Sequence, residues 1–104
     1  MMLRTIAPLT GLIVALSAAP VWAQTEKEQD CFYQASVVAQ IQNARMAKVK
    51  QKNVAAHIAE TEQSWPEKYN NLVPLLSPWV YDERHGDISD KNLATAWQEL
   101  CQQQ

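Results

Sequence analysis

The sequence predicts an all-α domain, a small bundle of four helices (three to five) whose first and last helices are joined by one disulfide. Residues 24–65 contain neither Gly nor Pro, the usual breakers of helices. The same stretch is rich in Ala, Gln, Glu, Lys and Met, which all favour helix. No segment alternates apolar and polar β-branched residues in the manner of a strand.

Residues 1–23 are predicted to be a secretory signal peptide. Arg4 makes the first residues positive, and an uncharged apolar run follows from Ile6 to Ala19. This run is shorter than the roughly 20 apolar residues that a transmembrane helix needs. Val21 and Ala23 suit the signal peptidase pocket, so we expect cleavage between Ala23 and Gln24.

Export defines both the folded domain and its compartment. Residues 24–104 are expected to form a single domain, which is located in the periplasm or is secreted. We expect this domain to contact the membrane only transiently, during export. The alternative is an uncleaved N-terminal helix that holds the domain at the membrane.

The two cysteines are predicted to form a disulfide. Cys31 lies near the start of the exported chain and Cys101 near its end, and an oxidising compartment would join them. A bridge across 70 residues would stabilise the fold by roughly 4 to 5 kcal/mol in the chain-entropy model. The alternatives are two free thiols, a bridge to another chain or a catalytic thiol, but the sequence has no C-x-x-C motif.

The first helix is expected to begin near Thr25. Glu26, Glu28 and Asp30 would lie in its opening turns, where the helix dipole favours carboxylates. A stripe at helical spacing would face the core: Cys31, Ala35, Val38, Gln42, Met46 and Val49.

A break is predicted between Lys48 and Asn53, where apolar residues lapse. Asn53 would cap a second helix with Val54, Ala55, Ile58 and Ala59 inward. One unbroken helix from Thr25 to Ser64 is the alternative.

Caps and prolines divide the second half. Ser64 and Glu67 have the spacing of a capping box, which would start a third helix that kinks or stops at Pro74. Ser77 and Pro78 would start a short helix over residues 79–85, ended by Gly86.

The last helix is predicted to begin at Ser89. Ser89 would be its cap, and Ile88 would pack on Leu93 as a hydrophobic staple. Its inward stripe would be Leu93, Ala96, Trp97, Leu100 and Cys101.

These features together resemble a broad group of exported proteins. Cys31 early in the first helix, Ala35 four residues later, the segment 79–81 before a capped last helix and the closing Cys101 are similar to small two-cysteine, all-helical periplasmic bacterial proteins of uncharacterised function. In size and single bridge the chain is also similar to the acid-stress chaperones of that compartment. The resemblance implies an exported helical bundle and assigns no functional residues.

The charge balance argues against nucleic acid as a partner. The chain from residue 24 has eight basic and eleven acidic residues, a formal net charge of −3. Proteins that bind nucleic acid need a basic surface. Two local clusters are interpreted as solvated faces: a basic one at Arg45, Lys48, Lys50 and Lys52, and an acidic one at Asp82, Glu83, Asp87 and Asp90.

No catalytic, cofactor or metal motif is present in the sequence. His57 and His85 lie in unrelated settings, and neither is near a Ser or Cys with an orienting acid. Glu83, His85 and Asp87 are interpreted as an ordinary polar turn rather than a metal site. We therefore expect no cofactor, no metal and no enzyme activity.

Aromatic residues are the one unusual feature, and two functions compete. As a non-catalytic binding module (an inhibitor, immunity protein or chaperone), the protein would hold another exported protein with exposed Trp65, Trp79 and Tyr81. In the simpler interpretation, these rings belong to the core. As a small periplasmic hydrolase of envelope material, it would need a concave site with His57 or perturbed carboxylates. We favour the binding module.

Overall fold

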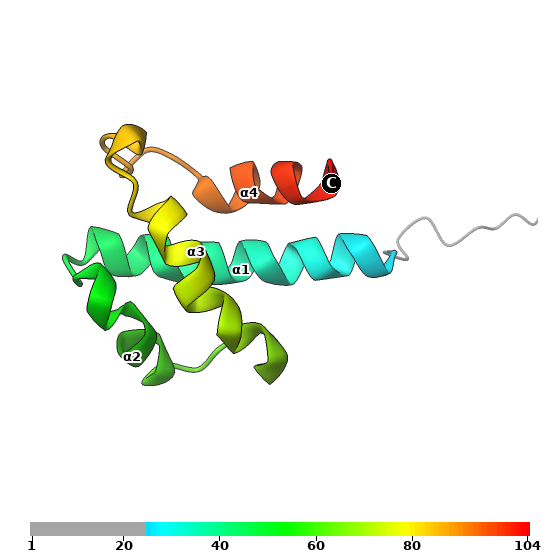
Figure 1. The fold of residues 1–104 in the computed structure, drawn as a ribbon, viewed down its shortest axis with the longest axis horizontal. Coiled ribbons are helices and arrows are strands. Elements are labelled where there is room, and N and C mark those ends of the chain that lie inside the picture. Colours follow the sequence, from blue (N-terminus) through cyan, green and yellow to red (C-terminus); the bar gives the residue numbers. More distant parts are fainter. Residues whose placement is uncertain (1–24) are drawn as a thin grey trace, which may run out of the picture.

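The computed structural model describes residues 25–104, which contain four α-helices and no strand (Figure 1). The helices are α1 (Glu26–Met46), α2 (Val54–Ala59), α3 (Leu72–Val80) and α4 (Leu93–Gln102), with the 3-10 turns η2 (Gln51–Asn53), η3 (Glu67–Asn71) and η4 (Glu83–His85) between them. The predicted all-α class is confirmed. The predicted signal peptide and its cleavage site lie outside the described residues. Within residues 25–104, no helix is both long and apolar enough to cross a membrane.

α1 is the centre of the fold. It contacts α2, α3 and α4, and Figure 1 shows α4 running back along α1 while α3 crosses it. Val37, Val38 and Ile41 of α1 are fully buried at this meeting point. The core is completed by residues of α2, η3, α3, α4 and two connecting segments: Val54, Ile58, Trp65, Tyr69, Val73, Leu76, Val80, Ile88 and Leu93.

A capping box at Thr25 begins α1, close to the predicted start. The Thr25 hydroxyl accepts a hydrogen bond from the Glu28 amide at 3.0 Å, and the Glu28 carboxylate accepts one from the Thr25 amide at 2.9 Å. These hydrogen bonds with Thr25 hold the pKa of Glu28 below its usual value. The box predicted at Ser64 and Glu67 is wrong, because η3 begins after Pro66 with no side-chain cap.

α1 ends in a Schellman motif with a lysine where glycine is usual. Lys48 has φ of 69°. The Lys48 amide donates to Arg45 O and the Val49 amide donates to Ala44 O, both at 3.0 Å. The break predicted here is confirmed, and the unbroken helix is wrong. Asn53 is not the side-chain cap we predicted, because its backbone continues the turn of η2.

Pro74 and Pro78 both lie within α3, in positions that differ from those predicted. α3 starts at Leu72, so Pro74 lies in the first turn, where the missing amide hydrogen has no partner within the helix. Pro78 lies inside α3 rather than at the start of a new helix. The helix predicted for residues 79–85 is therefore also wrong, although Gly86, at φ of 67°, does end η4.

α4 begins at Leu93, and its cap is Asn92 rather than the predicted Ser89. The Asn92 side chain accepts a hydrogen bond from the Thr95 amide at 3.0 Å. The buried Gln42 side chain selects this start, because its carbonyl oxygen accepts from the Leu93 amide at 3.1 Å and its nitrogen donates to Ile88 O and Lys91 O. Ile88 and Leu93 are both buried, as the predicted staple requires, but Leu93 is the first helical residue.

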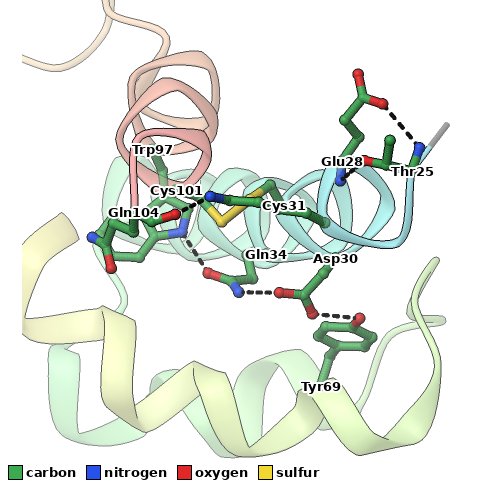
Figure 2. The surroundings of a disulfide bond; sticks show 10 residues. Thr25, Glu28, Asp30, Cys31, Gln34, Tyr69, Trp97, Cys101 and Gln104 are labelled. Atoms are coloured by element: carbon green, nitrogen blue, oxygen red, sulfur yellow. Dashed lines mark hydrogen bonds between the residues drawn. A yellow bond between two sulfur atoms is a disulfide. The ribbon is translucent and has the colours of Figure 1, made fainter.

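The predicted disulfide between α1 and α4 is confirmed (Figure 2). Cys31 and Cys101 are bonded, with their Cα atoms 5.6 Å apart. On α1 and α4, two predicted core residues are wrong, since Met46 is 45% exposed and Leu100 is 43% exposed. Met46 is the last residue of α1. In α4, the residues on the side toward α1 are four positions apart: Leu93, Trp97 and Cys101. Leu100 does not belong to this series.

A chain of hydrogen bonds beside the disulfide ties three elements together (Figure 2). Tyr69 of η3 donates to Asp30 at 2.7 Å, and Gln34 donates to the other Asp30 oxygen at 2.8 Å. Trp97 of α4 donates to Gln34 at 2.9 Å. Burial and the hydrogen bond to Asp30 raise the pKa of Tyr69 to about 12.

Candidate functional site

α3 is apolar around its whole circumference, yet one side faces solvent. Its nine residues, LVPLLSPWV, include no charged side chain. The core side buries Val73, Leu76, Ser77 and Val80. The outer face, defined here as Pro74, Leu75 and Pro78, is exposed, and Leu75 is 69% exposed. Helices that are apolar all round are normally buried on all sides, so this face is typical of a contact surface.

The outer face tolerates its two prolines because it is exposed. Pro78 has no amide hydrogen to give to Pro74 O, four residues earlier. Both prolines lie on the solvent side, where water can satisfy that carbonyl. On the buried side, Ser77 donates its hydroxyl hydrogen to Val73 O.

Arg45 of α1 fixes the far end of α3. Its guanidinium donates to Val80 O, the last carbonyl of α3, at 2.7 Å, and to Asp82 O at 3.3 Å. A second nitrogen lies 3.4 Å from Gly86 O. A cation at the carbonyl end of a helix complements the helix dipole, so α3 is anchored at this end. Arg45 was predicted to be part of a solvated basic cluster, but its guanidinium is bound to the end of α3. The other three members of that cluster, Lys48, Lys50 and Lys52, are exposed.

A groove runs between α2 and α3 beside the outer face. One hollow of about 460 Å³ is lined by Gln51, Lys52, Ala55, Pro74 and Ser77. A second, of about 310 Å³, is lined by Ala55, Ala59, Gln63, Asn70 and Val73. Ala55 borders both hollows, and we call the two together the α2–α3 groove. Ala55 and Ala59 were predicted to face inward but are exposed on α2, and only Val54 and Ile58 are buried there.

Charged residues lie close in sequence to the lining of the α2–α3 groove. Lys52 lines one end, and Lys50 lies just before it in the chain. At the other end, Glu60 follows Ala59 and Glu62 precedes Gln63. All four charged side chains are exposed. Of these four, Lys52 is the one that lines a hollow, whereas the other three are its neighbours in sequence or those of Ala59 and Gln63.

The aromatic residues predicted to bind a partner do not form one exposed surface. Trp65 is only 6% exposed, and its indole donates to the Asn70 side chain at 2.8 Å. Trp79 is half-buried against Trp97 and His85, with ring centroids 5.2 and 4.9 Å away. Tyr81 is half-buried and donates to Val49 O at 2.6 Å. These placements favour the simpler interpretation, in which the rings pack on the core.

Tyr81, Asp82 and Asp87 have pKa values shifted by their surroundings in the fold. Burial raises the pKa of Tyr81, and the charge of Arg45 partly opposes this. Hydrogen bonds from Arg84 hold the pKa of Asp82 well below its usual value. The Ser89 amide similarly lowers the pKa of Asp87 by donating to its carboxylate at 2.9 Å.

The residues considered for catalysis and for a metal do not converge. His57 is exposed on α2, outside the lining of both hollows. His85 Nε2 lies 2.8 Å from Trp79 O. Across residues 25–104, no three side chains of His, Cys, Asp or Glu are grouped so as to hold a metal ion.

The sequence prediction does not include the outer face, because it places a kink or a stop at Pro74 and a new helix after Ser77. A usable signal was present, since residues 72–80 contain no charge over a stretch longer than two helical turns.

Within residues 25–104, the fold and the site define a small, disulfide-closed helical bundle with an exposed apolar face on α3. No protein-family model, curated protein or solved structure matches the chain.

Proposed function

We propose that this protein is a non-catalytic binding module that holds another exported protein through the outer face of α3. The observation that carries the proposal is the exposure of Pro74, Leu75 and Pro78 on a helix without a charged residue. Exposed apolar side chains gathered on one helix are costly in water and are removed from it when a partner docks.

The rigidity of the face supports this role. α3 is held by its buried side and by the hydrogen bonds of Arg45 at its end. A surface that is ordered before binding loses little conformational entropy when the partner arrives.

The proposed location is the periplasm, after cleavage between Ala23 and Gln24. The disulfide points to an oxidising environment, which supports export. Intact-mass analysis of protein secreted by the producing cells is expected to show loss of the first 23 residues and of two hydrogens. An attached leader or two free thiols would contradict the proposed location.

Photo-cross-linking in the producing cells tests the binding function. A benzophenone amino acid at position 78 is expected to give an adduct with one exported protein, and the same group at position 74 should give the same adduct. Leu75→Lys should reduce the yield about tenfold, because a charge would be buried in an apolar contact.

Leu100→Lys is the matched control. Leu100 is also an exposed leucine, 43% accessible, but it lies on α4. We expect this variant to keep the full yield. Equal loss in both variants, or no protein adduct from positions 74 and 78, would refute the proposed function.

A further inference from the structure

We propose that Met46 is an oxidation site: peroxide converts its thioether to a sulfoxide, and the new oxygen weakens the hold of Gln42 on the segment that leads into α4. The site is separate from the outer face of α3, so it stands whether or not that face binds a partner. Three features of Met46 support it: its exposure, the hollow that it lines and its contact with Gln42.

Met46 lies largely outside the core. Methionine side chains are usually buried, but Met46, the last residue of α1, is 45% exposed. It is also the one methionine of residues 25–104, so an oxidant that reacts with thioethers has a single target there. A thioether in contact with solvent is oxidised more readily than one inside a core.

A hollow beside Met46 gives an oxidant access and gives the added oxygen room. Its volume is about 300 Å³, and its lining includes Met46 and Lys48 at the end of α1 and residues 86–89 before α4. Hydrogen peroxide is little larger than water, whose share of the liquid is about 30 Å³. The hollow therefore admits peroxide at the place where the end of α1 meets the segment that Gln42 holds.

The Met46 sulfur lies next to a hydrogen-bond donor that is already fully used. Gln42 Nε2 has two hydrogens, and it donates to Ile88 O at 2.9 Å and to Lys91 O at 2.7 Å. Met46 Sδ is 3.9 Å from the same nitrogen. A thioether is a weak acceptor and does not compete with two carbonyls. While Met46 is unoxidised, the Gln42 amide therefore holds both carbonyls.

Oxidation adds one oxygen atom to this sulfur. A sulfur lone pair attacks hydrogen peroxide, an S–O bond forms and the O–O bond breaks, and the hydroxide that leaves takes the proton of the transferred oxygen to give water. Sulfur loses two electrons and the peroxide gains them. The sulfoxide is polar, and its oxygen lies within reach of Gln42 Nε2. Three acceptors then compete for two hydrogens, so one of the two carbonyls loses its donor.

The start of α4 is the part of the fold that this competition affects. The Gln42 carbonyl oxygen accepts from the Leu93 amide at 3.1 Å, so a shift of the Gln42 side chain disturbs the first residue of α4. Near its other end, α4 is fastened to α1 by the Cys31–Cys101 disulfide, which peroxide leaves closed. Oxidation of Met46 therefore loosens residues 86–93 and leaves the helical bundle assembled.

Peroxide treatment followed by peptide mass spectrometry tests the site. The purified protein, with its disulfide intact, is expected to gain one oxygen atom at Met46, at a rate within about tenfold of the rate in the urea-unfolded protein. A larger difference between the two rates would show that the fold protects this sulfur, and the proposal would be overturned.

Nuclear magnetic resonance of the side-chain amides tests the link to Gln42. The signals of the Gln42 amide hydrogens are expected to shift when Met46 becomes a sulfoxide. Gln34 is the matched control, because it also lies on α1 and its side-chain amide donates to Asp30 at 2.8 Å. Its signals should stay in place. Unchanged Gln42 signals in the sulfoxide form, or equal shifts for both glutamines, would overturn the proposal.

Two variants separate the sulfoxide from other effects of peroxide. In the natural protein, peroxide should raise the equilibrium constant for unfolding about five- to tenfold, which is the effect of weakening one hydrogen bond. Met46→Leu removes the sulfur and should not respond to peroxide. Met46→Gln places a carbonyl oxygen near the sulfur position, and it should shift the Gln42 signals without peroxide. An equal response of Met46→Leu to peroxide would overturn the proposal.

Discussion

The carbonyl oxygen of Gln42, in α1, accepts a hydrogen bond from the amide of Leu93, the first residue of α4, at 3.1 Å. The nitrogen of the same side chain donates to Ile88 O at 2.9 Å and to Lys91 O at 2.7 Å. One buried glutamine therefore satisfies three backbone groups of the segment that leads into α4. This segment has its position because of a residue on another helix.

Gln42→Met is expected to destabilise the domain by about 2 to 4 kcal/mol, because the variant keeps the volume but leaves buried backbone groups without partners. Urea unfolding followed by circular dichroism measures this change. Gln29→Met, on the exposed side of α1, should change stability by less than about 0.5 kcal/mol. Equal effects would show that the Gln42 hydrogen bonds contribute little.

Lys48→Gly should stabilise the domain by up to about 1 kcal/mol. Lys48 has φ of 69°, a backbone conformation that is unfavourable for a residue with a Cβ atom. Glycine has no Cβ atom and adopts this conformation without strain. The midpoint of urea unfolding should rise. Lys50→Gly is the control, because Lys50 has φ of −70° and gains nothing from glycine. A lower midpoint for Lys48→Gly would contradict the prediction.

Opening the disulfide should cost roughly 4 kcal/mol, because the bridge closes a loop across 70 residues. The thermal midpoint of the oxidised protein should drop after treatment with a thiol reductant. The double variant Cys31→Ser and Cys101→Ser should already have the lower midpoint and should not respond to the reductant. An unchanged midpoint in the reduced protein would show that noncovalent contacts suffice.

Stability should decline at alkaline pH through Tyr69. The pKa of Tyr69 is raised to about 12 in the folded protein, whereas a free tyrosine ionises near pH 10. The unfolded chain thus loses this proton at a lower pH than the folded protein does. The contribution of Tyr69 to the free energy of unfolding is therefore complete below about pH 10 and is lost as the pH rises toward 12. Unfolding midpoints measured from pH 9 to pH 11.5 should fall less steeply for Tyr69→Phe. Parallel curves for the two proteins would refute this role of Tyr69.

Neighbouring leucines of α3 should respond differently to truncation. Leu75 is 69% exposed and Leu76 is 6% exposed. Leu76→Ala should destabilise the domain by about 2 to 5 kcal/mol because it opens a cavity in the core. Leu75→Ala should change stability by less than about 0.5 kcal/mol. The reverse order would mean that α3 is rotated, and the proposed contact face would be lost with it.

The sequence was sufficient for features that depend on local or covalent chemistry. The helical class, the break after Lys48 and the Cys31–Cys101 bridge follow from composition, a lapse in periodicity and the presence of only two cysteines. Each needs no knowledge of which helices meet.

The errors arose where a distant residue chooses between local alternatives. Ser89 and Asn92 can both cap a helix, and Gln42 favours Asn92 by bonding the Leu93 amide across 51 residues of sequence. Pro74 kinks or stops a helix in a local interpretation, but η3 delays the start of α3 to Leu72, and Tyr69 of η3 donates a hydrogen bond to Asp30 of α1. The candidate site could not be predicted for the same reason, because the exposure of Leu75 depends on how α3 packs against the other helices.

Both ends of the described chain lie at the same pole of the molecule (Figure 1). The Lys27 ammonium, in the first turn of α1, donates to the terminal main-chain oxygen of Gln104, and the disulfide joins the two helices nearby. A tag, dye or surface anchor attached after Gln104 would therefore be located at that end of the molecule, and α2 would remain accessible at the opposite end.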